Sequence, residues 1–178
     1  ATNPVSAGLV ALPGNLTAID ISVGANHACA VLSDHTLTCW GYGGAGQLGY
    51  GNGNSIGDNE TPATNPVSGG RVQLPGAQTV AAVEPGSSHT CAHLTSGDVA
   101  CWGNGPAGQL GYGNADIIGD DETPAANTVN GGVVALPGGQ DAVRLDTNSA
   151  HSCALLADGA MSCWGNGTDG RLGYGNTN

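Results

Sequence analysis

The chain has 178 residues, the size of a single domain. It has 14 acidic residues, three arginines and no lysine, which gives a net charge of −11. Binding to nucleic acid or to an anionic membrane surface depends on lysine and arginine, so this composition argues against both. No stretch reaches the ~18 apolar residues of a membrane helix, and 32 glycines are typical of short strands joined by tight turns.

Self-similarity is the dominant feature of the chain, which consists of three tandem copies of one 62-residue repeat. Each copy carries a histidine, two cysteines and a tryptophan in constant register. The histidines are His27, His89 and His151, and the tryptophans are Trp40, Trp102 and Trp164. We therefore divide the chain into repeats at residues 1–62, 63–124 and 125–178, the last lacking the final positions of the period, within one continuous repeat domain.

Short strands are expected within each repeat. In the first, residues 19–23 alternate between apolar and polar side chains, which is typical of a half-buried strand. Two further runs, 27–32 and 36–40, flank a three-residue turn whose third position is glycine in the other two repeats. Glycine at that position is typical of a hairpin closed by a bulged turn. The sequence therefore predicts an all-β chain with at least one hairpin per repeat.

The cysteine spacing fits this hairpin. If the last two runs pair, the two cysteines of each repeat lie directly opposite each other, roughly 4.5–5.5 Å apart, within disulfide range. The predicted disulfides are Cys29–Cys39, Cys91–Cys101 and Cys153–Cys163. A metal site and free thiols are the alternatives, but no fourth ligand recurs beside the histidine and the two cysteines, and structural zinc needs four. Disulfides imply an oxidising compartment, so we expect a secreted, extracellular protein.

The ends of the chain keep the same register. Residues 1–5 match residues 63–67, and residues 176–178 correspond to 114–116, so the chain begins after one acidic loop and stops before the next. Because its first residue is alanine, we expect a mature or cut product from which an export signal has gone. We also expect either a piece of a longer array or the unit of one.

Three strings recur in every repeat, and in the first repeat they read His27-Ala28-Cys29-Ala30, Cys39-Trp40-Gly41 and Gly46-Gln47-Leu48-Gly49-Tyr50-Gly51. They resemble the repeat of the regulator of chromosome condensation family, and the cysteine-bearing version is similar to repeats of secreted bacterial proteins. The resemblance implies β-propellers of seven four-stranded blades, with roles such as nucleotide exchange on a small GTPase, nucleosome binding or inhibition of secreted β-lactamases. This chain differs in having three repeats, a period above the usual ~50 residues, and no basic surface for nucleosomes.

Enzyme motifs are weak. Each repeat fits G-x-G-x-x-G, but a dinucleotide loop needs a helix directly after it, and the glycine-rich string that follows cannot form one. A catalytic residue is rarely needed three times, so we expect each repeated histidine to form a structural hydrogen bond within its own blade. For the tryptophans we expect packing between blades, with sugar stacking as the alternative. We expect no enzyme and no small-molecule substrate.

An acidic loop near the end of the first two repeats is the best candidate for specific chemistry. Clustered carboxylates beside a glycine suit Ca²⁺, and the expected ligands are Asp58, Glu60, Asp120 and Glu122. A solvated turn rich in aspartate and asparagine is the alternative. Glycosylation sequons lie at Asn15, Asn59 and Asn166, and they matter only where the host has the machinery.

These observations favour an extracellular structural or adhesive protein. We expect an open array of propeller blades, or part of a larger propeller or filament, whose partners are copies of itself packed head to tail. The loops of the repeats are nearly alike, which favours a polymer at the cell surface over a recognition module. The alternative is a secreted, protein-binding β-propeller that acts as an inhibitor or recognition module.

Overall fold

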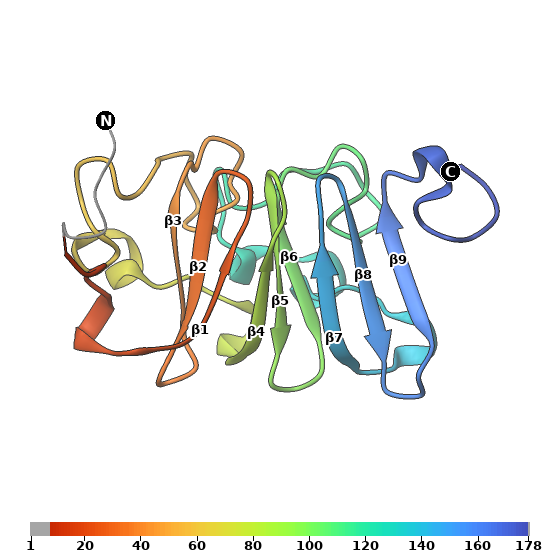
Figure 1. Cartoon of the computed structure of the whole chain (residues 1–178), viewed down its shortest axis with the longest axis horizontal. Coiled ribbons are helices and arrows are strands. Elements are labelled where there is room, and N and C mark those ends of the chain that lie inside the picture. Colours follow the sequence, from red (N-terminus) through yellow and green to blue (C-terminus); the bar gives the residue numbers. More distant parts are fainter. Residues whose placement is uncertain (1–7, 178) are drawn as a thin grey trace.

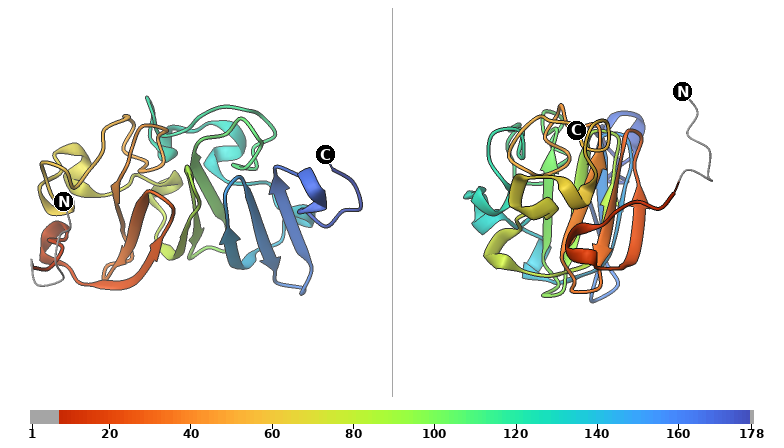
Figure 2. Two further views of the ribbon diagram at one scale, coloured as in Figure 1. Left: turned by 45° about the horizontal axis from the view of Figure 1, so that its top comes forward. Right: turned by 90° about the vertical axis from the view of Figure 1, so that its left-hand side faces the viewer.

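The computed structural model describes residues 8–177, so residues 1–5, whose register with 63–67 is noted above, lie outside it. In the described part, three antiparallel sheets of three strands each stand in a row and are not closed into a barrel (Figures 1 and 2). The expected all-β fold of blade-like repeats is therefore confirmed. We call the sheets the first, second and third blade in chain order. None of the helices among the described residues is long and apolar enough to cross a membrane.

Each blade is an up-and-down meander. The strands are β1 (Ala18–Val23), β2 (His27–Leu32) and β3 (Leu37–Gly41) in the first blade, β4 (Val80–Pro85), β5 (His89–Leu94) and β6 (Val99–Gly103) in the second, and β7 (Ala142–Thr147), β8 (His151–Leu156) and β9 (Met161–Gly165) in the third. Equivalent strands begin 62 residues apart, as the repeat predicts. The domain limits at residues 62 and 124 stay a prediction, because strand positions define a register and not a boundary.

The second and third strands of each blade pair in the register that the cysteine spacing predicts. Cys29 lies opposite Cys39, the two are joined by a disulfide, and their Cα atoms are 4.1 Å apart. The equivalent cysteines of the other two blades are joined in the same way. His35 occupies the left-handed turn position with φ of +61°, where the other repeats have glycine.

The blades have three strands where the family resemblance implies four. The segment after β3 forms only a single bridge, between Gly41 and Ile56. The Tyr50 hydroxyl takes over part of the missing strand's role, because it accepts the Cys39 N–H at 3.1 Å and donates to the Cys39 carbonyl at 3.0 Å. The Val72 N–H then donates to the Leu37 carbonyl. The glycines and prolines of this segment prevent a regular strand, yet the outer edge of β3 is hydrogen-bonded at these points.

The extra length of the repeat forms an outer belt of short 3₁₀ turns. These are η2 (Pro13–Asn15), η3 (Pro62–Thr64), η4 (Val67–Gly70), η5 (Pro75–Ala77), η6 (Pro124–Ala126), η7 (Val129–Gly132) and η8 (Pro137–Gly139), and η9 (Thr168–Gly170) follows β9. Backbone bonds join the belt from repeat to repeat, from the Ala63 N–H to the Ala11 carbonyl and from the Ala125 N–H to the Gln73 carbonyl. The belt therefore links neighbouring blades along the outer rim.

The hydrophobic core lies between the blades. β4 packs against β1 and β2, and β7 packs against β4 and β5. Trp102 and Val83, from the second blade, are fully buried in this core. Burial of such large side chains is the main favourable term in folding. Each blade therefore depends on its neighbours for stability, as expected for a repeat array.

Candidate functional site: the interfaces between blades

A hydrogen-bonded relay joins the first blade to the second. His27 Nε2 lies 2.7 Å from the Thr90 hydroxyl. That hydroxyl donates to the Gln47 carbonyl at 2.8 Å, and the Trp102 indole N–H donates to the same carbonyl at 3.0 Å. A hydroxyl has one proton to donate, so Thr90 must accept from histidine, and the His27 proton must be on Nε2. We call this set of a histidine, a hydroxyl, a backbone carbonyl and a tryptophan the clasp.

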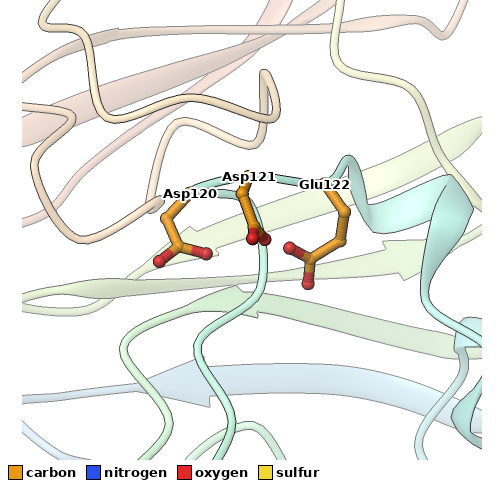
Figure 3. Close-up of side chains that lie close together, drawn as sticks. All are labelled: Asp120, Asp121 and Glu122. Carbon is orange, nitrogen blue, oxygen red and sulfur yellow. The ribbon is translucent and has the colours of Figure 1, made fainter.

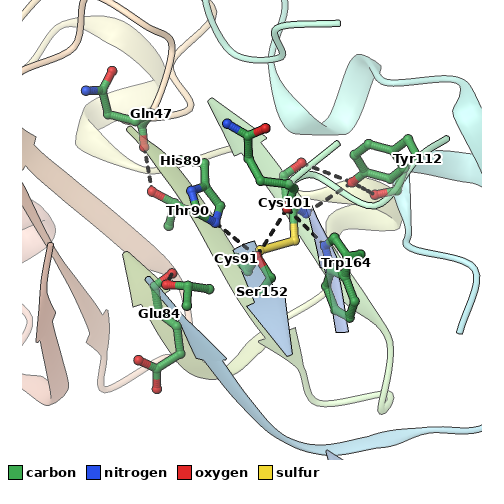
Figure 4. Close-up of a disulfide and its surroundings, with 12 residues drawn as sticks. Gln47, Glu84, His89, Thr90, Cys91, Cys101, Tyr112, Ser152 and Trp164 are labelled. Carbon is green, nitrogen blue, oxygen red and sulfur yellow. Dashed lines mark hydrogen bonds between the residues drawn. A yellow bond between two sulfur atoms is a disulfide. The ribbon is translucent and has the colours of Figure 1, made fainter. Parts of the chain in front are cut away.

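The same clasp joins the second blade to the third. His89 Nε2 lies 3.0 Å from the Ser152 hydroxyl, which donates to the Gln109 carbonyl at 3.1 Å. The Trp164 indole donates to that carbonyl at 2.9 Å. Figure 4 shows these side chains beside the Cys91–Cys101 disulfide, with Ser152 entering from the third blade. The same contact therefore forms at both interfaces between blades, as expected of a feature of the repeat.

The clasp histidines are structural, but they do not bond within their own blade as we expected. Each histidine side chain lies on the face of the second strand that is turned toward the next blade, and its hydrogen bond is made to that blade. Burial lowers the pKa of both His27 and His89 to about 4, so both rings are neutral at physiological pH. A neutral ring with its proton on Nε2 is a hydrogen-bond donor at the interface. This arrangement supports packing between blades rather than proton transfer.

The outer faces of the first and third blades expose positions that are buried inside the array. Ile21 is 61% exposed, whereas its equivalents Val83 and Leu145 are 0% and 4% exposed. At the other end, Met161 is 74% exposed, whereas its equivalent Val99 is 0% exposed. The two ends of the array are therefore the two uncovered halves of the interface between blades.

The end faces also carry the two halves of a contact in which the tryptophan of one blade packs against a glycine of the blade before it. We call the space over this glycine the tryptophan slot. An added Cβ on Gly49 would come within 2.7 Å of the Trp102 indole nitrogen, and one on Gly111 within 2.9 Å of that of Trp164. Gly173, the equivalent glycine of the third blade, has nothing within 4 Å of that point. The third blade thus presents an open slot, and the first blade presents a partly buried tryptophan, Trp40, with no blade before it in the described chain.

One element of the clasp is missing from the first blade. The hydroxyl residue that follows the histidine in the second and third repeats is Thr90 and Ser152, but in the first repeat it is Ala28. Ala28 pairs with Trp40 in the same register as Thr90 with Trp102, so the backbone is in place and only the hydroxyl is absent. The first blade can therefore offer its tryptophan but no acceptor to a preceding histidine.

The acidic loop of the second repeat brings its two expected calcium ligands, Asp120 and Glu122, close to a third carboxylate. Asp120, Asp121 and Glu122 have carboxylate oxygens within 4.8 Å of one another (Figure 3). Burial, together with the neighbouring Asp121 carboxyl, raises the pKa of Glu122 to about 7. A carboxyl that holds a proton near neutral pH must release it before it can bind a cation. Calcium binding by Asp120 and Glu122 stays a prediction.

Asp58 and Glu60, the ligands expected in the acidic loop of the first repeat, do not belong to any such cluster of three among the described residues. They line a polar cavity of about 390 Å³ in the first repeat, together with Asn52, Asn54 and Asn65. The acidic loop of the second repeat has a different neighbour, because an added Cβ on Gly46 would lie 2.7 Å from the Asp120 backbone nitrogen. That loop therefore packs on the glycine-rich loop of the preceding blade and is part of the interface.

The glycosylation sequons fall on the surface to different degrees. Asn15 and Asn59 are exposed, and Asn166 is partly buried, with its side-chain oxygen accepting the Thr168 N–H at 2.9 Å. Modification of these residues stays a prediction.

Sequence reasoning missed the hydroxyls and the tyrosines. Thr90 and Ser152 are ordinary strand residues in sequence, and their only signal is that a hydroxyl follows the histidine in two repeats. The tyrosines had a stronger signal, because they recur in register inside the glycine-rich string. Tyr50, Tyr112 and Tyr174 each bond the backbone of the second cysteine of their repeat. Burial raises the pKa of Tyr112 to about 12, which keeps its hydroxyl protonated.

Comparison with known proteins agrees with these repeats. The family model "Regulator of chromosome condensation (RCC1) repeat" matches residues 18–47, 79–109 and 143–171. The ultraviolet-B receptor UVR8 of Arabidopsis thaliana is 34% identical over 158 residues, which are 88% of this chain and 31% of that protein. The human RCC1 domain-containing protein 1 is 27% identical and covers 93% of this chain and 49% of its own length. The chain thus spans half or less of these relatives.

Solved structures share the fold at low identity. A chain in the crystal structure of Kap60 bound to yeast RCC1 (Prp20) superposes with a TM-score of 0.63 at 20% identity, over 89% of this chain and 34% of that one. Human WBSCR16 superposes with a TM-score of 0.61 at 20% identity, over 86% of this chain and 35% of that one. With the family match over three repeats and the three blades above, the chain belongs to the regulator of chromosome condensation (RCC1) repeat family.

Proposed function

We propose that this chain is a non-catalytic interaction module of an extracellular assembly, and that copies of it bind end to end through the first and third blades. The observation that carries the proposal is the exposure of both halves of the interface at the two ends. Ile21 and Met161 are 61% and 74% exposed, and a covering blade would bury both. Burial of one such side chain stabilises a contact by about 1.5–3 kcal/mol. The disulfides support an extracellular setting.

Charge opposes this association. Each copy has a net charge of −11, so two copies repel each other at low ionic strength. Salt screens that repulsion over about 8 Å at physiological strength and over a shorter range at higher concentration. We therefore expect end-to-end binding to strengthen as sodium chloride is raised, which is the opposite of binding driven by attraction between opposite charges.

The proposal is tested by sedimentation of the purified chain over a concentration series at two salt concentrations. Ile21→Asp should abolish concentration-dependent association, because the side chain enters the contact. Ile19→Asp is the matched control, because it makes the same change on the same strand. Ile19 is 54% exposed, and its equivalents in the other two blades, Ala81 and Val143, are exposed as well. A chain that stays monomeric throughout, or equal effects of the two substitutions, would contradict the proposal.

A second function is a secreted, protein-binding propeller module that acts in recognition or inhibition. The observation that favours it is the length of this chain relative to the solved propeller chains, because its three blades cover about a third of each of them. In that case further blades, and not copies of this chain, cover the end faces. The sedimentation experiment separates the two functions, since a monomer indifferent to Ile21→Asp favours the second.

A further inference from the structure

We propose that residue 28 determines the strength and the selectivity of the end-to-end contact. At this clasp position the first blade lacks the hydroxyl that the second and third blades, each of which packs on a preceding blade, both carry. The inference rests on the proposed function. It assigns Ala28 as a specificity-determining residue and His151 as its opposite partner. Neither residue contacts the other within a single copy, since they lie on the first and third blades.

Both internal interfaces match a histidine to a hydroxyl. His27 meets Thr90, and His89 meets Ser152, at 2.7 and 3.0 Å. In each case the hydroxyl donates a hydrogen bond to a backbone carbonyl of the histidine's blade. The histidine N–H therefore keeps a partner after water has been removed. This satisfies the rule that buried polar groups need hydrogen bonds.

At a contact between two copies, the same geometry would place His151 against Ala28 of the next copy. A methyl group accepts no hydrogen bond, so the His151 N–H would lose its water and gain no partner. A buried donor left unpaired weakens a contact by roughly tenfold or more. The backbone carbonyl of Arg171, at the position of Gln47 and Gln109, would still receive the Trp40 indole. Copies of this chain should therefore stack, but more weakly than its own blades pack.

A hydroxyl at residue 28 would complete the clasp. Ala28 lies opposite Trp40 in the register that Ser152 has with Trp164, and it is partly exposed on the end face. A serine there would accept from His151 and donate to the Arg171 carbonyl. The end face of the third blade thus fits best a blade with serine or threonine directly after its histidine. A blade with alanine at that position fits less well.

The experiment measures self-association of the wild-type chain, Ala28→Ser, His151→Ala and the double variant by sedimentation equilibrium. Ala28→Ser should tighten the dissociation constant at least about tenfold, and this gain should vanish when His151 is alanine. Ala25→Ser is the matched control, because Ala25 is exposed and serine stands at the equivalent positions 87 and 149. The control should leave the constant unchanged.

The outcomes separate this inference from the proposed function. If the chain associates, Ile21→Asp weakens it and Ala28→Ser has no effect, then residue 28 does not face His151 and the inference is wrong, while end-to-end binding stands. If the gain from Ala28→Ser persists without His151, the inference is also wrong. If neither the wild-type chain nor Ala28→Ser associates at any concentration, both the inference and the proposed function are overturned.

Discussion

Replacing Thr90 with valine should destabilise the folded chain by about 2–4 kcal/mol. Valine keeps the shape of threonine but removes the hydroxyl that joins the first two blades. His27 is 4% exposed, so its unpaired N–H costs about 1–3 kcal/mol. The lost bond to the Gln47 carbonyl adds only about 0.5–1.5 kcal/mol, because that carbonyl keeps the Trp102 indole as a partner.

Urea unfolding followed by circular dichroism measures this change, provided that the m-value stays constant. Thr90→Ser should cost less than about 1.5 kcal/mol, because serine supplies the same hydroxyl in the third blade and only a methyl is lost. Thr95→Val, at an exposed position just after β5, should stay within about 0.5 kcal/mol of the wild type. If Thr90→Val is as stable as Thr95→Val, the clasp contributes nothing and our account of the interface is wrong.

Three further predictions concern pH, reduction and nucleic acid. Between pH 6.5 and 4 the histidines bind protons in the unfolded chain, whereas the buried His27 and His89 stay neutral in the folded chain. The free energy of unfolding therefore decreases as the pH is lowered from 6.5 to 4, by about 3 kcal/mol for each ring. The raised pKa of Glu122 acts in the opposite direction, so thermal unfolding is best compared in Glu122→Gln; a melting temperature unchanged between pH 7 and 4 would contradict the burial of the rings. In dilute solution a mild reductant should open Cys153–Cys163 first, because its cysteines are partly exposed and the others are buried, and equal alkylation of all six cysteines would oppose this. The chain should not bind DNA, given its net charge of −11, and salt-sensitive binding in a gel-shift assay would refute that expectation.

Local relations along the chain made the hairpins predictable. The distance from each cysteine to the turn is the same on both sides, and antiparallel pairing then places the cysteines opposite each other. The missing fourth strand was not predictable from the resemblance. A tyrosine hydroxyl replaces part of a strand only when the chain curls back over β3, and that path depends on contacts made more than ten residues away. The calcium sites expected from composition stay a prediction, and the structure adds only that Asp58 and Asp120, which share a sequence pattern, have different surroundings.

The sequence by itself determined the repeat, the hairpin register, the cysteine pairs and the family, because each of these follows from residue types and their spacing along the chain. Only the tertiary structure decided which residues meet between blades. His27 and Thr90 are 63 positions apart, and nothing in their local sequence links them. They meet because apolar side chains can be buried only by stacking one sheet on the next, and that stacking brings a histidine of one blade to a hydroxyl of the following one. The role that we propose for Ala28, an ordinary residue in the sequence, rests on this packing alone.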